Sequence, residues 1–498
     1  MASNVCDMDK DSLYKAIRSK DVRFDGRIFV AVKSTKIYCR PICRAKCPKI
    51  ENCTFYPHAA VAEKNGYRPC LLCRPELAPG ESLATSMADP LAGLARKAMR
   101  RIEDGALNEQ SVEELAGEFG VSSRHLRKAF ETSLGVTPTE MAHTCRLLQA
   151  KQLLTDTEIS ITDIAFSAGF SSLRQFNHVF RKKYRLSPRD FRKAIPSSST
   201  VTRSTKESTQ QSLRLDYRPP FNWAALSGFL KTRAIPGVEC IEDDCYMRTV
   251  MVNNHQGWLS VRPRRDKRRH ALEVQIADNL VPVATQLLAR TRTLFDVRAN
   301  IDSIEQQLRT DELLAPVIER YSGMRLPGAF DGFELLLRAI LGQQISVKAA
   351  TTLAGRFAAV FGHKIYTPFP SLTRSTPDPE RIADARLSKI QAQGLPRKRA
   401  ETIKAAAIAA AQNKLMLEPG ADPALTRQTL VEIPGIGEWT ADYVAMRALD
   451  WPDAFPSGDL GVKKALGLSK RKEIVARSQQ WQPWRAYATM HLWLSLAT

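Results

Sequence analysis

Four cysteines near the N-terminus have a spacing that can hold a metal ion. The segment IYCRPIC contributes Cys39 and Cys43, and the segment RPCLLC contributes Cys70 and Cys73. Two close pairs of thiolates on a short stretch of chain are typical of a tetrahedral zinc site. The zinc ion then either holds a small fold together or keeps one sulfur deprotonated for chemistry. The spacing by itself favours the structural role.

A tight turn between two expected helices precedes a lone carboxylate in the C-terminal half. In LVEIPGIGEWTADY one helix ends before the turn and a second begins near Glu438, so Gly435 and Gly437 let the backbone approach a phosphate closely. This layout is a helix-hairpin-helix, which anchors DNA irrespective of its sequence. Asp459 follows the turn in AFPSGDLGVKKAL. Its carboxylate either caps the next helix or stabilises positive charge on a reacting sugar, and the two roles are compatible.

The composition indicates a multidomain protein with a polyanionic partner. The chain has 498 residues and a formal net charge of +21, from 73 Lys and Arg against 52 Asp and Glu. A chain of this length is too long to form one hydrophobic core, and the excess of cationic residues favours nucleic acid as the partner. Six of the ten cysteines fall between residues 39 and 73, which argues against a disulfide framework and for a reducing, cytoplasmic, DNA-associated location. No apolar run is long enough to cross a membrane, and we expect a monomer.

A low-complexity segment separates the two halves of the chain. Residues 196–212 read PSSSTVTRSTKESTQQS, in which ten of seventeen residues are Ser or Thr. Such a stretch buries too little apolar surface to fold by itself. We interpret it as a flexible linker between two functional halves.

An internal repeat precedes this linker. ELAGEFGVSSRHLRKAF and DIAFSAGFSSLRQFNHVF each contain a short amphipathic helix, a turn at Gly120 or Gly169, a Ser-Ser helix cap and a second helix. One copy would be an ordinary helical hairpin, whereas two matched copies in a basic protein favour DNA binding. The region resembles the AraC-type DNA-binding domain, which implies recognition helices near 122–130 and 171–180. The outward side chains expected to reach bases or phosphates are Arg124, His125, Arg127, Lys128, Arg174, Gln175, Asn177 and His178.

Nearly all of residues 213–498 resembles the AlkA-type glycosylases of alkylated bases. The resemblance is carried by YRPPFNWAALSGFL, MRLPGAFDGFELLLRAILGQQISVKAA, the hairpin and PWRAYATMHLWL. It implies a helix-hairpin-helix body over 326–498 after a subdomain with an antiparallel sheet over 213–325, and it makes Asp459 the catalytic carboxylate for a base flipped out of the duplex. The aromatic residues at the family's pocket positions are Phe229, Trp439, Tyr443 and Trp493. Their rings would hold a cationic base, and core packing is the alternative, above all for Phe229.

Departures from the family's pattern narrow the expected activity. Enzymes that also cut the DNA backbone carry a lysine just after the hairpin, whereas this chain has Trp439, so the sequence predicts a monofunctional glycosylase. No cysteine follows Cys245, which excludes the iron–sulfur cluster of some relatives. Gln344 stands where the family inserts an apolar wedge into DNA, and Leu460 replaces an aromatic residue. The preferred lesion among N3- and N7-methylated purines stays open.

The segment around the four cysteines, residues 5–78, resembles the N-terminal domain of the Ada-type alkylation-response proteins. The resemblance rests on GRIFVAVKSTKIYCRPICRAKCPKIENCTFYPHAAVAEKNGYRPCLLCRPE. It implies that the four cysteines bind Zn²⁺ and that Cys39 irreversibly accepts a methyl group from a DNA methylphosphotriester. Methylating one sulfur removes one negative charge, which is expected to strengthen DNA binding. Whether the additional Cys47 and Cys53 take part is left open.

Together these patterns predict a fusion of an alkylation sensor with a base-excision enzyme. The expected parts are a zinc domain (1–80), an all-α double helix-turn-helix domain (88–195), the linker (196–212) and the glycosylase (213–498). The fold class is therefore multidomain and mainly α, with small α+β parts. The expected partners are alkylated double-stranded DNA, promoter DNA and RNA polymerase. The alternatives are a transcription regulator with a weak or inactive glycosylase body, and a first half that only delivers the enzyme to damaged DNA.

Overall fold

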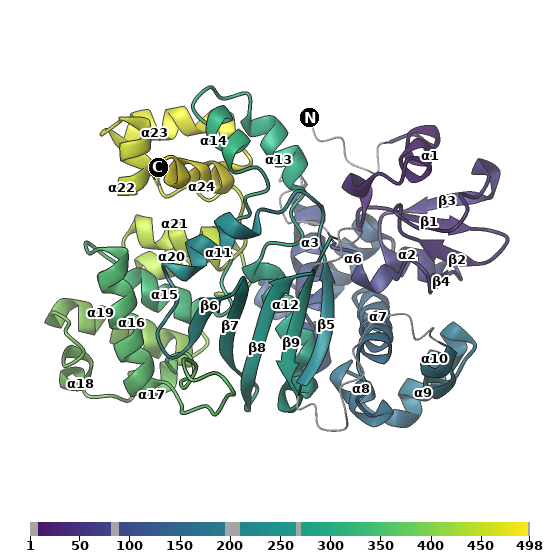
Figure 1. The fold of residues 1–498 in the computed structure, drawn as a ribbon, viewed down its shortest axis with the longest axis horizontal. Coiled ribbons are helices and arrows are strands. Elements are labelled where there is room, and N and C mark those ends of the chain that lie inside the picture. The colour runs from purple at the N-terminus through teal and green to yellow at the C-terminus, as the bar shows by residue number, and fades with distance from the viewer. Residues whose placement is uncertain (1–7, 81–88, 195–209, 265–269, 497–498) are drawn as a thin grey trace. The chain divides into compact units, whose positions relative to one another are not determined.

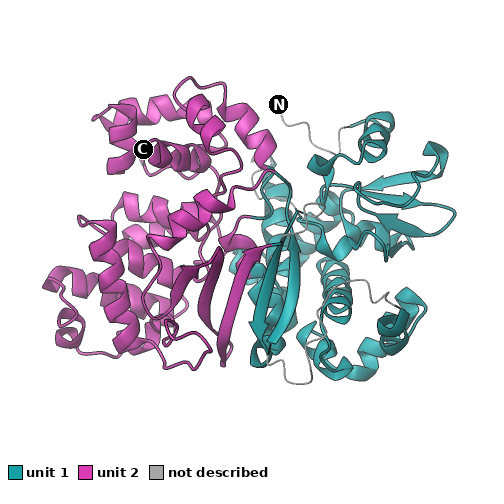
Figure 2. Ribbon diagram, in the orientation of Figure 1, with its two compact units in different colours: residues 1–219, 264–289, 297–300 teal, residues 220–263, 290–296, 301–498 magenta. Residues whose placement is uncertain are grey.

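The structure is a computed structural model that describes residues 8–80, 89–194, 210–264 and 270–496. Most of the predicted linker 196–212 lies outside these residues, and its last three residues begin strand β5. The chain divides into two compact units, treated separately below (Figure 2). Unit 1 comprises residues 1–219, 264–289 and 297–300, and unit 2 comprises residues 220–263, 290–296 and 301–498.

The first part of unit 1 is a small α+β fold around a four-stranded sheet (Figure 1). The strand order is β3-β1-β2-β4, in which β1 pairs antiparallel with β2 and β3, and β2 pairs parallel with β4. Leu13 and Ile17 of the first helix pack with Ile28 and Val30 under the cysteine cluster. The elements are α1 (Lys10–Arg18), β1 (Phe29–Val32), β2 (Ile37–Cys39), β3 (Cys53–Tyr56), α2 (Ala59–Lys64) and β4 (Arg68–Pro69).

The helical part of unit 1 contains both predicted helix-turn-helix copies. Ser122 and Ser172 cap the second helix of each copy, because their hydroxyls accept the backbone N–H three residues on, each at 3.2 Å. Gly120 and Gly169 take the left-handed conformation at the turns, with φ of +66° and +86°. The elements are α3 (Pro90–Glu103), α4 (Ala106–Glu109), α5 (Val112–Glu118), α6 (Ser123–Leu134), α7 (Pro138–Asp156), α8 (Ile161–Ser167), α9 (Leu173–Tyr184) and α10 (Pro188–Ala194). The recognition helices α6 and α9 thus each run four residues past the predicted end.

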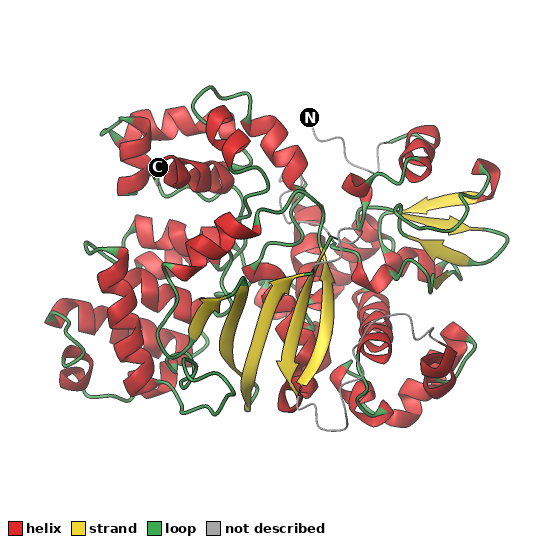
Figure 3. Cartoon of the chain, in the orientation of Figure 1, coloured by secondary structure: helices red, strands yellow, loops and turns green. Residues whose placement is uncertain are grey.

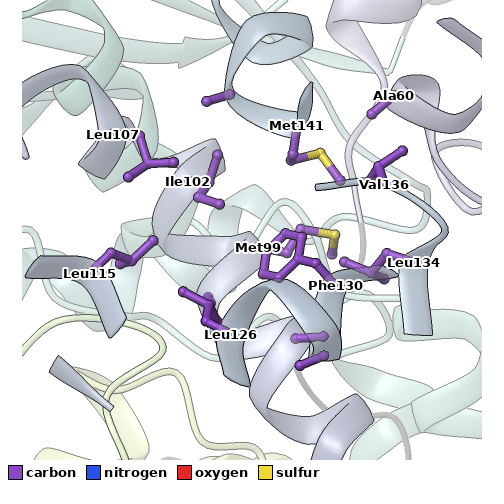
Figure 4. Close-up of a cluster of buried hydrophobic side chains, with 14 of the residues drawn as sticks. Ala60, Met99, Ile102, Leu107, Leu115, Leu126, Phe130, Leu134, Val136 and Met141 are labelled. Carbon is purple, nitrogen blue, oxygen red and sulfur yellow. The ribbon is translucent and has the colours of Figure 1, made fainter. Parts of the chain in front are cut away.

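The core of this helical part explains the spacing of its apolar residues. Leu115 of α5, Leu126 and Phe130 of α6, and Ile102 of α3 are buried in one cluster (Figure 4). Residues three or four positions apart on a helix share a face, so the spacing of these apolar residues places them together in the core. The charged residues of α6 are left on the opposite, exposed face.

Unit 1 also contains an antiparallel strand pair, and one of the chain's passages from unit 1 to unit 2 falls within a helix. Strand β5 (Gln210–Asp216) pairs with β9 (Ala271–Ala277), with Leu213 opposite Val274. Helix α12 (Ala284–Leu294) begins in unit 1 and ends in unit 2. The predicted strand pattern of AlkA-type relatives is therefore present, and part of it packs with the N-terminal half of the chain.

Unit 2 is a helical body with an antiparallel meander (Figure 3). In β6–β7–β8, Ile241 pairs with Tyr246 and Met247 with Ser260. This arrangement confirms the predicted fold class. The elements are α11 (Trp223–Lys231), β6 (Glu239–Glu242), β7 (Cys245–Val252), β8 (His255–Pro263), α13 (Ile301–Leu308), α14 (Ala315–Arg320), α15 (Gly332–Leu341), α16 (Val347–Phe361), α17 (Pro379–Ala383), α18 (Leu387–Gln391), α19 (Arg397–Ala411), α20 (Pro423–Val431), α21 (Glu438–Arg447), α22 (Leu460–Leu466), α23 (Arg471–Ser478) and α24 (Arg485–Ser495).

The hairpin between α20 and α21 forms as predicted. The second helix begins at Glu438, and Gly435 has a φ of +91°. A Cβ at this glycine would lie 2.1 Å from the Thr402 hydroxyl, so a side chain is excluded by space as well as by conformation. Among the described residues, no helix combines the length and the apolar character needed to span a membrane.

Candidate functional site

The four predicted cysteines come together at the ends of two parallel strands. Cys39 ends β2 and Cys70 directly follows β4, and the register of these strands places the two sulfurs side by side. The sulfurs of Cys39, Cys43, Cys70 and Cys73 all lie within 4.8 Å of one another. Tetrahedral zinc with bonds of about 2.3 Å needs sulfurs about 3.8 Å apart, so the donor set fits Zn²⁺ in both type and spacing.

The two additional cysteines stay outside this cluster. Cys47 is exposed, and Cys53 is buried with its sulfur directed to the Lys49 carbonyl at 3.3 Å. Within the cluster, Cys39 and Cys70 are buried, whereas Cys43 and Cys73 are half-buried. The sulfurs that the structure brings together are thus those of the four predicted cysteines.

Buried ion pairs hold the loops of the cysteine cluster. The backbone N–H of Arg40 donates to the Cys73 sulfur at 3.3 Å, and its guanidinium pairs with Asp25 and, at 2.8 Å, with Asp216 of β5. Lys151 of α7 donates to the Cys70 carbonyl at 3.2 Å and pairs with the buried Glu76. The cluster is therefore fastened both to the helix-turn-helix part and to β5.

The predicted DNA-reading side chains lie on the exposed faces of α6 and α9. Arg127 makes a surface ion pair with Glu113 at 2.9 Å, and the Gln175 side chain accepts from Ser171 at 2.9 Å. Asn177 is half-buried. The exposed members of the set are Arg124, His125, Arg127, Lys128, Arg174, Gln175 and His178.

A cavity of about 1160 Å³ opens beside the hairpin of unit 2. It is lined by Gly435 and Gly437 of the hairpin and by residues of α15, α16, α21, α22 and α24. Its size fits a flipped nucleotide with space for solvent. The predicted residues that line it are Gly435, Gly437, Gln344, Trp439, Tyr443, Asp459 and Trp493.

Asp459 stands at this cavity and is held by three donors. Its Oδ1 accepts from the Val462 backbone N–H at 3.0 Å and from Trp493 Nε1–H at 2.9 Å, and its Oδ2 accepts from Trp439 Nε1–H at 2.9 Å. The carboxylate is therefore a helix cap and, at the same time, a fixed negative charge at the cavity. The structure thus contains the helix cap weighed from the sequence, and it places the carboxylate at the cavity, where the catalytic alternative requires it.

The aromatic residues surround the cavity on one side. Trp439 stacks on Tyr443 with ring centroids 5.5 Å apart and planes 15° apart, and Tyr443 lies 6.3 Å from Trp493. Phe229 lies 6.3 Å from Trp493 but does not line the cavity, because the Arg233 guanidinium covers its ring at 3.7 Å. The predicted pocket thus has Arg233 at the surface where the sequence placed Phe229.

The cavity is also lined by Gln343, Arg233 and Arg338, which were not singled out from the sequence. The Gln343 side chain donates to the Gly435 carbonyl at 3.1 Å and to the Thr440 hydroxyl at 3.2 Å, which ties the α15–α16 turn to the hairpin. Its neighbour Gln344 has a φ of +60°, a conformation rare outside glycine. The GQQ sequence offered a signal for Gln343, whereas no local signal places Arg233 or Arg338 in the lining.

Four family descriptions match successive parts of the chain. They are the metal binding domain of Ada (residues 12–76), a helix-turn-helix domain (115–194), the AlkA N-terminal domain (212–331) and the HhH-GPD superfamily base excision DNA repair protein (337–480). The fold and the two sites therefore define a DNA repair protein of the helix-hairpin-helix superfamily that is joined to a zinc domain and a DNA-binding module. Zn²⁺ is its cofactor.

A relative of nearly the same length narrows this class. The "Probable bifunctional transcriptional activator/DNA repair enzyme AlkA" of Mycobacterium tuberculosis is 37% identical over 492 residues, covering 98% of this chain and 97% of the relative. The chain belongs to this family of bifunctional transcriptional activator/DNA repair enzymes.

Shorter proteins match a little more than half of the chain. "DNA-3-methyladenine glycosylase 2" of Escherichia coli is 35% identical over 279 residues, which cover 56% of this chain and 95% of that protein. Among solved structures, the 3-methyladenine DNA-glycosylase from Archaeoglobus fulgidus covers 56% of this chain and 97% of its own, with 20% identity and a TM-score of 0.48.

Proposed function

We propose that this chain repairs alkylated DNA in two ways and also regulates the response to that damage. The second half hydrolyses the glycosidic bond of N3- and N7-methylated purines without cutting the backbone. The first half transfers a methyl group from a DNA methylphosphotriester to its own cysteine. The observation that carries the proposal is the Asp459 carboxylate, held by two indole N–H groups at the cavity beside the hairpin.

Base release follows from the charge and position of this carboxylate. When the bond between C1′ of the sugar and the base nitrogen breaks, the bonding electrons leave with the base and the sugar becomes positive. Asp459 stabilises that charge and accepts a proton from the water whose oxygen bonds to C1′. Trp439 and Trp493 fix the carboxylate in place, so it needs little reorganisation during the reaction.

Methyl acceptance uses a sulfur of the cysteine cluster. Bound Zn²⁺ keeps the cysteine sulfurs deprotonated at neutral pH. The Cys39 sulfur attacks the methyl carbon, the carbon–oxygen bond breaks, and its electron pair stays on the phosphate oxygen. The product is a thioether, so each protein accepts one methyl group. Cys43 and Cys73 are more exposed than Cys39, and a test of this assignment must therefore separate the four sulfurs.

The helix-turn-helix part is assigned to promoter DNA and to activation of repair genes. Its support is the tandem pair of capped recognition helices, with Arg124, Lys128 and Arg174 exposed. RNA polymerase is the proposed protein partner, and the chain acts as a monomer in the cytoplasm. The proposed domain bounds remain 1–80, 88–195 and 213–498, joined by 196–212.

A single-turnover assay tests the glycosylase function. The full chain is incubated with duplexes that carry one 7-methylguanine or one 3-methyladenine, and the released base is measured. Release with an intact backbone is expected, and the same duplexes with undamaged purines are the control. No release from either duplex, beside promoter binding that responds to methylation, would favour the regulator with an inactive body.

A further inference from the structure

Arg40 connects the two cysteine pairs of unit 1. It directly follows Cys39, and its backbone N–H donates to the Cys73 sulfur at 3.3 Å. Its guanidinium is buried, and Nη1 donates to the Cys73 carbonyl at 3.3 Å. One residue thus joins the loop of the first cysteine pair to the loop of the second.

Two carboxylates hold this guanidinium at different nitrogens. Asp25 accepts from Nε at 2.8 Å and also pairs with Nη2, which is the bidentate arrangement of strong arginine–carboxylate pairs. Asp216 accepts at 2.8 Å from Nη1, the nitrogen that also reaches Cys73. Asp216 ends strand β5 and lies in the proposed glycosylase domain, residues 213–498. The second half of the chain therefore supplies one of the two anions that fix Arg40.

The charges beside the cysteine cluster are balanced. Asp216 also accepts from Arg214 Nη2 at 2.7 Å, so two arginines and two aspartates form one group with Arg40 and Asp25. The members of a second group with two cations and two anions are Arg74, Lys151, Glu76 and Asp156. Removing one partner of a buried ion pair leaves the other charge uncompensated. Loss of the Asp216 carboxylate would therefore leave one positive charge unpaired beside the sulfurs.

Methyl transfer moves negative charge away from the sulfurs. The Cys39 sulfur bonds to the methyl carbon, the carbon–oxygen bond breaks, and its electron pair remains on the phosphate oxygen, so the negative charge ends on the DNA. An unpaired cation buried beside the sulfurs stabilises the thiolates before transfer more than the thioether after it. Such a charge slows the transfer, and a carboxylate that cancels it keeps the transfer fast.

We propose that Asp216 is a positioning residue for methyl acceptance, which the glycosylase half of the chain supplies to the cysteine cluster. It holds Arg40 against both cysteine pairs and cancels part of the positive charge there, so that the Cys39 sulfur stays reactive. This role rests on the proposed methyl acceptance at Cys39. The zinc site is then complete only with a residue of the second half, and the fusion of the two halves serves methyl acceptance itself.

The test measures methyl transfer to full-length variants. A duplex that carries one methylphosphotriester is mixed with the wild type, Asp216→Asn or Asp216→Glu at several DNA concentrations, and mass spectrometry follows the methylated Cys39 peptide over time. For Asp216→Asn the transfer rate at saturating DNA is expected to fall about tenfold, the effect of one unpaired charge inside a protein. The DNA concentration that gives half of this rate should not rise, because an added positive charge does not weaken DNA binding.

Two further readouts separate this role from support of the fold. Asp216→Glu keeps the charge, and a cavity of about 270 Å³ lined by Asp25, Arg40 and Asp216 has space for the extra methylene, so its rate should stay within about threefold of the wild type. Full-length proteins loaded with Co²⁺ in place of zinc give a sulfur-to-cobalt absorption band. In Asp216→Asn this band should move to shorter wavelength, because an unpaired cation lowers the energy of the sulfur electrons.

A matched control removes an exposed carboxylate of the same unit. Asp278 directly follows β9, the partner strand of β5, and accepts from Gln211 at 2.7 Å, so Asp278→Asn should keep the wild-type rate and band. A wild-type transfer rate or an unmoved band in Asp216→Asn would overturn the proposal. An equal loss of base release in this variant, or a rate in Asp216→Glu as low as in Asp216→Asn, would also overturn it, because the residue would then only support the fold. A wild type that gains no methyl group would reject the proposed methyl acceptance itself.

Discussion

The zinc site of unit 1 and the cavity of unit 2 differ in how the chain builds them. The four sulfurs come from residues 39 to 73 and meet beside the ends of two neighbouring strands. The cavity draws its lining from residue 233 to residue 496 and from at least five helices. A cluster that holds one small ion needs only short connections, whereas a pocket that encloses a base needs walls from several elements.

The difference extends to the proposed chemistry. A sulfur that attacks a methyl group is consumed, because the thioether has no route back to a thiolate. The carboxylate of Asp459 is regenerated once its proton returns to solvent, so the same cavity serves many bases. The comparison therefore predicts that a change at one site abolishes or slows the activity of that site and leaves the activity of the other site intact.

The largest effect is expected at the cysteine cluster. Cys39→Ser removes the proposed acceptor, so methylated DNA should transfer no methyl group to the protein, while base release stays at the wild-type rate. Mass spectrometry of the cysteine peptides, with a zinc assay, is the measurement. Cys47→Ser is the matched control, because Cys47 is exposed and lies outside the cluster. A methyl group on Cys43, Cys70 or Cys73 of the wild type would contradict the assignment.

Asp459→Asn should have the opposite effect to Cys39→Ser, with base release impaired and methyl acceptance intact. Asn keeps the shape and caps a helix about as well as Asp, but its amide nitrogen would face one of the two indole N–H donors. Single-turnover release of 7-methylguanine is expected to fall at least about 10²-fold, since the charge that stabilises the sugar is lost. Methyl acceptance should be unchanged. A wild-type rate of release would reject this carboxylate as catalytic, and a collapsed melting curve would point to a structural role.

A smaller loss is expected when one indole donor is removed. Trp493→Phe keeps an aromatic ring but deletes the N–H that donates to Asp459 at 2.9 Å. A hydrogen bond to a charged group contributes about 1.5–3 kcal/mol, so release should slow about tenfold or somewhat more. Trp484→Phe is the control, because its indole N–H donates to Gln307 at the surface. Equal rates for both variants would mean that Asp459 needs no orientation by Trp493.

The smallest expected effect is a loss of folding stability at acid pH. Burial lowers the pKa of His491 to about 4, and its Nδ1 has no partner among the described residues. The unfolded state binds a proton near pH 6.5, so the free energy of unfolding falls as the pH drops from there toward 4. At about pH 5.5 the free energy of unfolding should be about 1 kcal/mol lower than at neutral pH, by the same linkage relation.

His491→Leu should abolish this part of the pH dependence. Denaturant titrations of wild type and variant at several pH values measure it, and their difference cancels the loss of zinc that both proteins share at low pH. Parallel pH profiles for the two proteins would show that His491 does not remain neutral in the folded chain.

The sequence alone predicted the features that depend on short spacings or on a single backbone conformation. The two cysteine pairs, the caps at Ser122 and Ser172, the turns at Gly120 and Gly169 and the hairpin before Asp459 were all predicted, and the structure contains each of them. The fold class followed for the same reason. The apolar periods that predict helices and strands can be read from short stretches of sequence. The order of the domains came from the resemblance to known families.

The tertiary structure decided the contacts between residues far apart in the chain. It paired Arg40 with Asp216, placed Arg233 over Phe229 and directed two indole N–H groups to Asp459. Any of the chain's 73 basic side chains is chemically able to pair with any carboxylate, and every indole carries the same donor. Which of them meet depends on how packed elements bring their surfaces together, and this information is spread over the whole core rather than held in a local pattern.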